Sequence, residues 1–542
     1  MRGGRDSAHV VVEVHAFAEL ATDERLARDC EGDWITIASV VLEPRAENGL
    51  RDVRVAIVGA GFGGIGTAIK LLEAGYEDLV ILERDDGLGG TWWANTYPGC
   101  ACDVAAHLYS FSFALNPDWS RFFAPQAEIL DYLRRVARDR GIEPLIRFGT
   151  EVTGARWDEH ASRWRVQTDR GAFSARVLVS AAGGLTEPKL PAVPGLDSFA
   201  GAMFHSARWD HGHDLSGERV GVIGTGSTAS QIVPEVQKHA ARLTVFQRSP
   251  GWVLPRLDHP HSDLQKLLLR RFPALQRAIR AAIYYNNELL ILGLVRRPRL
   301  LAGLERLALG YLKRQVPNTE IRTKLTPDYR IGCKRIIISS DFLGTFMKPN
   351  VELVTEGIRE IVPDGIVTQD GRKIELDTIV FATGFDVMNP PHFRHVVGRG
   401  GRSIRDVWDE DGIRAYLGTV IPGFPNHFVL LGPNTASGNN SALQPIEAQI
   451  GFAIDALRAM DARGATAVDV RRDVMERFDD EIQRRLAPTV WNSGGCHSWY
   501  VGPDGRNFTI WPAFANEYKR RLARFDPAEF ELTSAPVAVA VG

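Results

Sequence analysis

Two glycine-rich turns constrain the fold of this 542-residue chain more than any other feature. At residues 54–75 and again at 219–236, a β-branched run leads into a glycine turn and then into apolar residues at helical spacing. The motif positions are Gly59, Gly61 and Gly64 (GxGxxG) in the first turn and Gly224, Gly226 and Ala229 (GxGxxA) in the second. Such glycines allow a tight turn, close approach of a pyrophosphate and close helix packing. The chain is therefore predicted to be α/β, with two Rossmann-like dinucleotide-binding domains.

The residue that ends the second strand of each motif distinguishes the two sites. Glu83 and Arg248 each stand 24 residues after the first glycine of their motif. An acid at this position accepts hydrogen bonds from ribose hydroxyls, whereas a cation suits the 2′-phosphate of NADP. We therefore predict that FAD binds at the first turn and NADPH at the second. Ser227 and Thr228, inside the second turn, are further candidate NADPH contacts.

The order of these motifs predicts a discontinuous FAD domain. A connector with a proline at every third position, at 186–196, leaves the first domain, and a buried strand at 376–386 marks the return. The predicted units are a weakly ordered N-terminal extension at 1–50, an FAD-binding domain at 51–198 and 385–542, and an inserted NADPH-binding domain at 199–384.

Composition excludes several classes of partner. A formal net charge of −2 gives no general attraction for nucleic acid, and no protein partner is indicated. Five cysteines in so long a chain do not predict a disulfide framework, which favours a reducing, cytoplasmic location. No His/Cys cluster suggests a metal. The apolar run at 289–295 is far shorter than the roughly 20 residues that a membrane span needs.

The stretch FAGAMFHSARWD, residues 199–210, is the most specific motif in the chain. Taken alone, it is compatible with one buried histidine in a domain joint. Its spacing matches FxGxxxHxxxW followed by Pro or Asp, at Phe199, Gly201, His205, Trp209 and Asp210. With the two glycine turns, it resembles the fingerprint of Baeyer–Villiger monooxygenases, over roughly residues 53–515. The resemblance implies that His205, Trp209 and Asp210 couple domain rotation to NADPH placement.

Three further segments resemble the active centre of that family. In GLGGTWWANTYPGCACD, residues 87–103, the resemblance places Gly90 and Trp92 on the flavin side and Asp103 near the reactive ring. In YRIGCKR, residues 329–335, it implies that Lys334 pairs with the NADP phosphate and that Arg335 lies over the flavin. In the segment 494–512 it suggests Trp499 as a substrate-side residue. Here the family usually has Gly after the final proline, and this chain has Ala513.

The resemblance implies that NADPH reduces FAD, that O₂ forms a C4a-peroxyflavin, and that this species attacks a ketone to give an ester or lactone. The cofactor carries these steps, and the protein supplies positive charge where negative charge develops. Arg335 is the predicted catalytic cation, because a guanidinium stays protonated at any working pH, and Asp103 is predicted to hold it.

Three alternatives share part of this pattern. A flavin-containing monooxygenase that oxygenates nitrogen or sulfur uses the same layout. A flavin-binding protein without oxygenation would also keep the first turn. A disulfide reductase needs a redox cysteine pair, and Cys100-x-Cys102 has the wrong spacing for CxxC or CxxxxC.

Residues 264–315 form a basic helical insert in the predicted NADPH domain. The segment holds eleven Lys and Arg residues, Arg297 among them, against Glu288 and Glu305, with apolar residues between them. Such an amphipathic segment is compatible with a solvated helical face, a cover over the substrate entrance, or peripheral contact with an anionic membrane.

Overall fold

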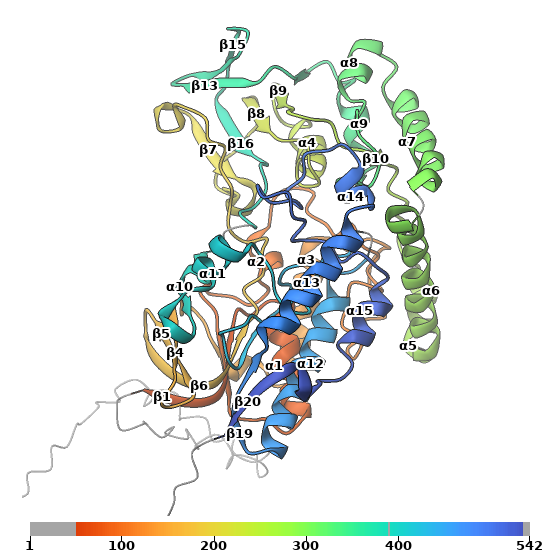
Figure 1. Ribbon diagram of the computed structural model, residues 1–542. Coiled ribbons are helices and arrows are strands. Elements are labelled where there is room, and N and C mark those ends of the chain that lie inside the picture. The colour runs from red at the N-terminus through yellow and green to blue at the C-terminus, as the bar shows by residue number, and fades with distance from the viewer. Residues whose placement is uncertain (1–49, 297, 388–390, 439, 535–542) are drawn as a thin grey trace, which may run out of the picture.

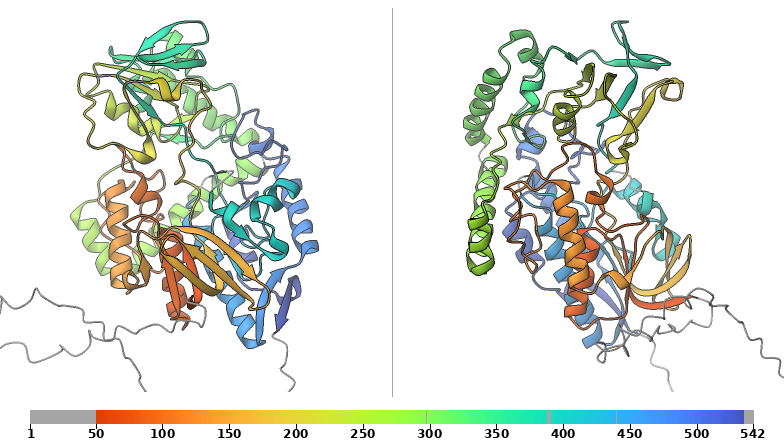
Figure 2. Two further views of the ribbon diagram at one scale, coloured as in Figure 1. Left: turned by 90° about the vertical axis from the view of Figure 1, so that its left-hand side faces the viewer. Right: turned by 180° about the vertical axis from the view of Figure 1, so that it is seen from behind.

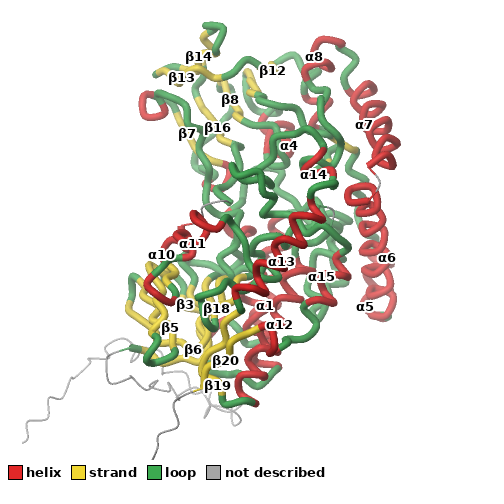
Figure 3. The backbone as a smooth tube through the Cα atoms, viewed as in Figure 1, coloured by secondary structure: helices red, strands yellow, loops and turns green. Residues whose placement is uncertain are grey.

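The computed structural model describes residues 50–296, 298–387, 391–438 and 440–534 (Figure 1). The predicted extension lies outside these residues except for Leu50, and so does Arg297 of the basic insert. Two bodies make up the molecule, the first built on a mixed β-sheet and the second on a parallel one, and Figure 3 shows loops running between them.

The first sheet contains the first glycine motif. Its strands run in the order β17-β4-β5-β6-β1-β2-β3, with β18 also pairing with β6. The strands are β1 (Arg51–Val58), β2 (Leu79–Leu82), β3 (Ile146–Arg147), β4 (Val152–Asp158), β5 (Arg163–Thr168), β6 (Gly171–Ser180), β17 (Val396–Val397) and β18 (His427–Val429). The central strand β1 pairs in parallel with β2 and β6. Its residues Val55, Ala56 and Ile57 are fully buried, as expected for a strand covered on both faces.

The second sheet contains the second glycine motif, and all its strands are parallel. The order is β12 (Val351–Val354), β9 (Arg242–Phe246), β8 (Arg219–Ile223), β16 (Thr378–Phe381) and β7 (Ala202–His205). The buried strand predicted near 376–386 is β16, which lies between β8 and β7. A strand from residues 378–381 therefore completes a sheet whose first strand in the sequence is β7, at residues 202–205.

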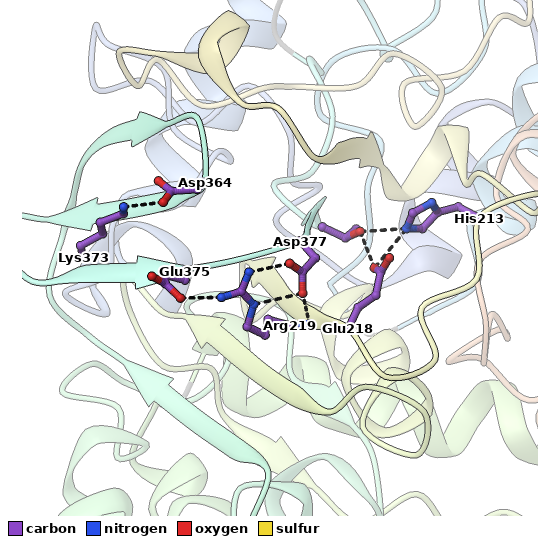
Figure 4. A network of polar contacts seen from close by, with 8 residues as sticks. His213, Glu218, Arg219, Asp364, Lys373, Glu375 and Asp377 are labelled. Carbon is purple, nitrogen blue, oxygen red and sulfur yellow. Dashed lines mark hydrogen bonds and ion pairs between the residues drawn. The ribbon is translucent and has the colours of Figure 1, made fainter.

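Ion pairs join strands of the second sheet at one end (Figure 4). Arg219, on β8, donates to both carboxylate oxygens of Asp377, at 2.6 and 3.1 Å, and to Glu375 at 2.5 Å. The Thr378 hydroxyl donates to Glu218 at 2.7 Å, and His213 contacts the same carboxylate. This network fixes the start of β16 against β8.

Helices cover the first sheet and form the main core. Helix α1 (Phe62–Glu73) follows the first glycine turn, is buried along most of its length and packs against α12 (Leu443–Ala462). Helices α3 (Gln126–Asp139), α13 (Arg472–Leu486) and α15 (Ala515–Arg521) complete this body, with the two-stranded sheet β19 (Ala465–Val470) and β20 (Phe530–Ser534). Helix α4 (Ala229–Val236) follows the second turn as predicted.

The basic insert is helical, as predicted. It forms α5 (Asp263–Arg271), α6 (Pro273–Ile291) and α7 (Leu301–Gln315), with a π-helical turn at Leu292–Arg296 after α6. These helices line one edge of the molecule in Figure 1, and the reversed view in Figure 2 shows the same edge. Within the described residues, no helix combines the length and apolar character of a membrane span.

Candidate functional site

The first glycine turn accepts no side chain at Gly59 or Gly64. Gly59 has φ +99°, and a Cβ on it would lie 2.8 Å from the carbonyl oxygen of Ala181. A Cβ on Gly64 would lie 1.8 Å from the carbonyl oxygen of Gly59. Gly61 faces Gly90, which has φ +55° and would place a Cβ 3.1 Å from the Gly61 Cα. Two bare backbone segments therefore meet at the N-terminus of α1, which suits a pyrophosphate.

Glu83 lies buried at the end of β2 and supports this turn. Its carboxylate accepts hydrogen bonds from the backbone N–H of Ala60 at 2.6 Å and of Asp85 at 3.0 Å. Burial raises the pKa of this carboxyl, and the two N–H donors oppose that rise. The sequence predicted only a ribose acceptor here, so the hydrogen bond to the turn is an additional structural role.

At the second turn two cations come together. A Cβ on Gly224, at φ +120°, would lie 2.3 Å from the carbonyl oxygen of Ala382, whereas Gly226 is open to space. The Lys334 ammonium donates to the Ser249 hydroxyl at 2.9 Å, next to the exposed Arg248. Burial lowers the pKa of Lys334, and the positive charge of Arg248 lowers it further. Two neighbouring cations beside a glycine turn suit the 2′-phosphate of NADP.

Asp103 and Arg335 form a two-bond ion pair. The guanidinium donates from Nε to Oδ2 at 2.8 Å and from Nη2 to Oδ1 at 2.7 Å. Burial alone would raise the pKa of Asp103, but the charge of Arg335 outweighs it and holds the pKa low. The same pair raises the pKa of Arg335. Arg335 keeps 41% of its side chain exposed, so its charge can act on a bound molecule.

The loop that carries Asp103 docks on the second body. The Tyr97 hydroxyl donates to the Gln231 side-chain oxygen at 3.0 Å, and Gln231 donates in turn to the Ala101 carbonyl at 3.0 Å. Gln231 lies on α4, directly after the second glycine turn. On the other side of this loop, the indole of Trp92 is buried and donates to the Tyr109 hydroxyl at 3.1 Å. The predicted flavin-side segment thus contacts the helix of the predicted NADPH site.

A disulfide connects the Lys334–Arg335 loop to the C-terminal segment. Cys333 and Cys496 are bonded, although they stand 163 residues apart. This bond was not predicted from the sequence, because neither spacing nor motif marked the two cysteines as a pair. The backbone N–H of Arg330 also donates to the Gly494 carbonyl at 2.9 Å. These contacts bring residues 494–500 to the site.

Two residues near Arg335 were missed by sequence reasoning. Tyr500 is buried, and its pKa is raised by that burial and lowered by the adjacent Arg335. Its neighbour Trp499 is 48% exposed, with its ring centroid 4.8 Å from that of Tyr500. Arg256 donates to the carbonyls of Phe123 at 3.3 Å and of Cys102, the residue before Asp103, at 3.5 Å. Tyr500 belongs to a segment that the sequence marked, but nothing marked Arg256.

His205 lies at the end of β7, beside Phe385, where the chain leaves β16 and the second body. Its Nδ1 accepts from the backbone N–H of Ala207 at 3.1 Å, and its ring makes an edge contact with Phe385. Burial lowers the pKa of His205 to about 4, against the opposing effect of the Gly384 backbone. Trp209 packs its ring on Phe204. The side chain of the exposed Asp210 accepts a hydrogen bond from the Gly212 N–H at 2.9 Å, and this bond stabilises the turn at residues 210–212.

The cysteines near the flavin turn carry no disulfide. Cys100 and Cys102 are both free. Burial raises the pKa of the Cys100 thiol to about 12, and it raises that of Cys102 as well. Thiols that stay protonated near neutral pH are poor nucleophiles. This argues against the disulfide-reductase alternative. Within the described parts of the chain, no group of three or more His, Cys, Asp and Glu residues could hold a metal ion.

Two dinucleotide turns joined by one loop are the layout of a flavoprotein that also binds a pyridine nucleotide. The model of a family described as flavin-binding monooxygenase-like matches residues 52–288. A Baeyer–Villiger monooxygenase of Streptomyces coelicolor is 45% identical over 489 residues, which cover 90% of this chain and 94% of that protein. One from Pseudomonas aeruginosa is 43% identical, over 90% of this chain and 93% of its own.

Solved structures show the same architecture. A closed structure of cyclohexanone monooxygenase aligns with a TM-score of 0.80 and 29% identity, over 90% of this chain and all of that one. An oxidised steroid monooxygenase bound to NADP aligns with a TM-score of 0.79 and 33% identity, over 89% of this chain and all of that one. The chain belongs to the Baeyer–Villiger monooxygenases. It is an enzyme that uses FAD and NADPH to insert one oxygen atom of O₂ beside a ketone carbonyl.

Proposed function

We propose that this enzyme converts a ketone to an ester or lactone at a centre where Asp103 holds the Arg335 guanidinium in place. The observation that carries the proposal is the pair of hydrogen bonds, 2.7 and 2.8 Å long, between the two side chains. A planar guanidinium fixed along one edge presents its remaining face in a defined direction. There it can stabilise the negative charge that develops on the oxygen atoms of the reaction.

The residues of the two turns would hold the cofactors. FAD, reduced by NADPH, supplies the activation of O₂. We assign Gly59, Gly61, Gly64, Gly90, Glu83 and Trp92 to the FAD side, and Gly224, Gly226, Ser227, Thr228, Arg248 and Lys334 to the NADPH side. A Cβ at Gly59, Gly64 or Gly224 would clash with a backbone carbonyl oxygen, which supports both turns as close-approach sites for a dinucleotide. The corresponding domains would be 51–198 with 385–542, and 199–384.

His205 and Trp209 are proposed to couple the two domains. The supporting observation is the position of His205 between β16, with which its strand pairs, and the Phe385 ring at the second crossing of the chain. Asp210 would contribute by shaping the turn that follows. The histidine would act as a neutral, buried contact that moves with the joint, because its pKa is lowered to about 4.

The substrate is proposed to be a cyclic or otherwise apolar ketone. Related structures carry the names of cyclohexanone and steroid monooxygenases. The exposed Trp499 packs on Tyr500, which lies beside Arg335, and supports an apolar wall on the substrate side. The cytoplasmic location suggested by the cysteine content stays a prediction, and the Cys333–Cys496 bond does not support it.

The test is a screen of NADPH oxidation with ketones and thioethers, with products identified by mass. Cyclohexanone, a larger cyclic ketone, a steroid ketone and an aryl methyl sulfide form the first panel. The proposal expects ketone-dependent NADPH consumption and a product heavier by one oxygen atom that hydrolyses as an ester. Sulfoxide formation with no ester from any ketone would refute it and favour a sulfur-oxygenating enzyme.

A further inference from the structure

Helix α6 presents its apolar side chains outward. Exposed apolar residues recur on it at spacings of three and four, so they form one stripe along the helix. The stripe consists of Leu275, Ala278, Ala282, Tyr285 and Leu289, and Leu292 continues it into the π-helical turn. Tyr285 is 60% exposed and Leu289 is 65% exposed. A helix on the surface of a globular protein normally shows the opposite pattern.

The inner face of α6 is polar, and its hydrogen bonds fix the rotation of the helix. Gln276 donates to the Asn116 carbonyl at 2.6 Å. Arg280 donates to the carbonyls of His107, Leu108 and Ser110 at 2.9 to 3.0 Å. Glu288 accepts from the Asn440 amide and from the Ala515 N–H, both at 2.9 Å. All three side chains are buried, so turning α6 to hide its leucines would leave these polar groups without partners.

The neighbouring helices extend the apolar surface. Within the described residues, 12 of the 17 exposed large hydrophobic side chains lie between positions 264 and 309. Those outside the stripe are Leu264, Leu267, Leu268 and Phe272 around α5, Leu290 on α6, and Leu300, Leu307 and Leu309 at α7. Helices α5, α6 and α7 follow one another along the same edge of the molecule (Figures 1 and 2). Single exposed leucines are ordinary, whereas this concentration marks an interaction surface.

The same helices expose many cations and few acids. Their exposed basic residues are Arg270, Arg271, Arg277, Arg296, Arg299, Arg306, Lys313 and Arg314. Of the acids, Asp263 is exposed, Glu288 is buried, and Glu305 is paired with Arg330 at 3.0 Å. Two copies of the chain that met through this face would bring rows of like charge together. An anionic surface with an apolar interior complements both the cations and the leucines.

We propose that the outward face of α5, α6 and α7 binds the surface of a membrane that contains anionic lipids. The leucine and tyrosine side chains enter the boundary between headgroups and acyl chains, and the arginines contact the headgroups. The helices lie on the membrane. They do not cross it, because the apolar stripe occupies one side of α6 only.

Co-sedimentation with vesicles tests this proposal, using the flavin-loaded enzyme at low salt. Vesicles of phosphatidylcholine alone are compared with vesicles that also contain phosphatidylserine. We expect binding to the second kind and release from it at high salt. Absence of binding, or equal binding to both kinds at all salt concentrations, would overturn the proposal.

Two pairs of variants separate the apolar and basic contributions. Tyr285→Ser with Leu289→Ser removes the centre of the stripe, and Leu185→Ser with Leu190→Ser removes two exposed leucines elsewhere. Arg271→Gln with Arg277→Gln removes two cations of the face, and Arg135→Gln with Arg138→Gln removes two exposed cations from α3. Each variant of the face should weaken vesicle binding about 10- to 30-fold. Equal loss in the α3 or Leu185 variants would overturn the assignment of the face.

Sedimentation velocity without vesicles distinguishes the competing occupant. If the wild-type protein is a dimer, the double variant Tyr285→Ser with Leu289→Ser is a monomer, and neither binds vesicles, then a second copy of the chain covers the face. Turnover of a water-soluble ketone without vesicles should be unchanged in all four variants. If the wild-type enzyme oxidises no ketone, the proposed function is refuted. The vesicle result is independent of that outcome and still tests membrane binding.

Discussion

Asp103 and Arg335, which stand 232 residues apart in the chain, meet through two parallel hydrogen bonds. Asp103 lies on the loop that follows the first glycine motif, and Arg335 lies on the loop that Cys333 bonds to the C-terminal segment. Since Gln231 of α4 also holds the Asp103 loop, this pair lies where the FAD side, the NADPH side and the C-terminal segment converge. A change at the pair should therefore affect chemistry more than cofactor retention.

Substitution of Arg335 by Ala should slow oxygen transfer strongly and leave FAD bound. The loss of one well-placed electrostatic stabiliser costs on the order of 100- to 1000-fold in rate. FAD retention rests on the distant Gly59 turn and on Glu83, so the protein should remain yellow. Arg335→Lys should restore only part of the activity, because a point charge cannot make the two-bond fork. The measurement is the amount of ester formed per NADPH consumed.

The matched control is Arg330→Ala, five residues earlier, whose exposed guanidinium pairs with Glu305 at 3.0 Å. It should keep wild-type ester yield. If Arg335→Ala also keeps that yield, then Arg335 is only a surface cation and the active centre lies elsewhere.

The sequence predicted the parts of this site that local pattern encodes. The glycine positions at 59 and 224, the strand at 376–386 and the residues Asp103 and Arg335 are all recognisable within short segments. Their contact depends on how the loops meet across 232 residues, which no periodicity reports. Tyr500 and the Cys333–Cys496 bond were missed for the same reason. The sequence left the orientation of the α6 leucines open, because a helical pattern shows which residues share a face but not which face is buried.

Loss of the Cys333–Cys496 bond should lower thermal stability. A cross-link that closes a long loop stabilises the folded chain by about 2–4 kcal/mol. The double substitution Cys333→Ser with Cys496→Ser should therefore lower the Tm, as should a reductant added to the wild-type protein. In the double variant the reductant should have no further effect. An unchanged Tm, or peptide mapping that finds both thiols free, would exclude the bond.

Asp469 should make stability depend on pH. This residue of β19 is buried, accepts from the Gly423 N–H at 3.0 Å and lies 3.2 Å from Arg399. Burial raises its pKa from 3.8 to about 7, although Arg399 opposes the rise. The folded state then binds this proton more tightly than the unfolded state. The associated stability is full below pH 3.8, falls as pH rises and is lost above about 7.

The variant Asp469→Asn should therefore show a smaller fall in Tm than the wild type between about pH 5 and 8, since each pKa unit corresponds to about 1.4 kcal/mol. Asp131→Asn, at an exposed position of α3, is the control and should follow the wild-type curve. Parallel curves for Asp469→Asn and the wild type would mean that Arg399 keeps Asp469 ionised in the folded state.

Arg248 and Lys334 should set the preference for NADPH over NADH. The two cations lie together beside the Gly224 turn, and the charge of one lowers the pKa of the other, which a bound phosphate would offset. Because a hydrogen bond to a charged group contributes about 1.5–3 kcal/mol, Arg248→Ala or Lys334→Ala should raise the KM for NADPH about 10- to 100-fold. The KM for NADH, which has no 2′-phosphate, should change little. Arg242→Ala is the matched control, because this exposed cation of β9 pairs with Glu352 at 2.6 Å and should leave both constants unchanged. Equal losses with both cofactors would assign the two cations to general folding or to the shared pyrophosphate.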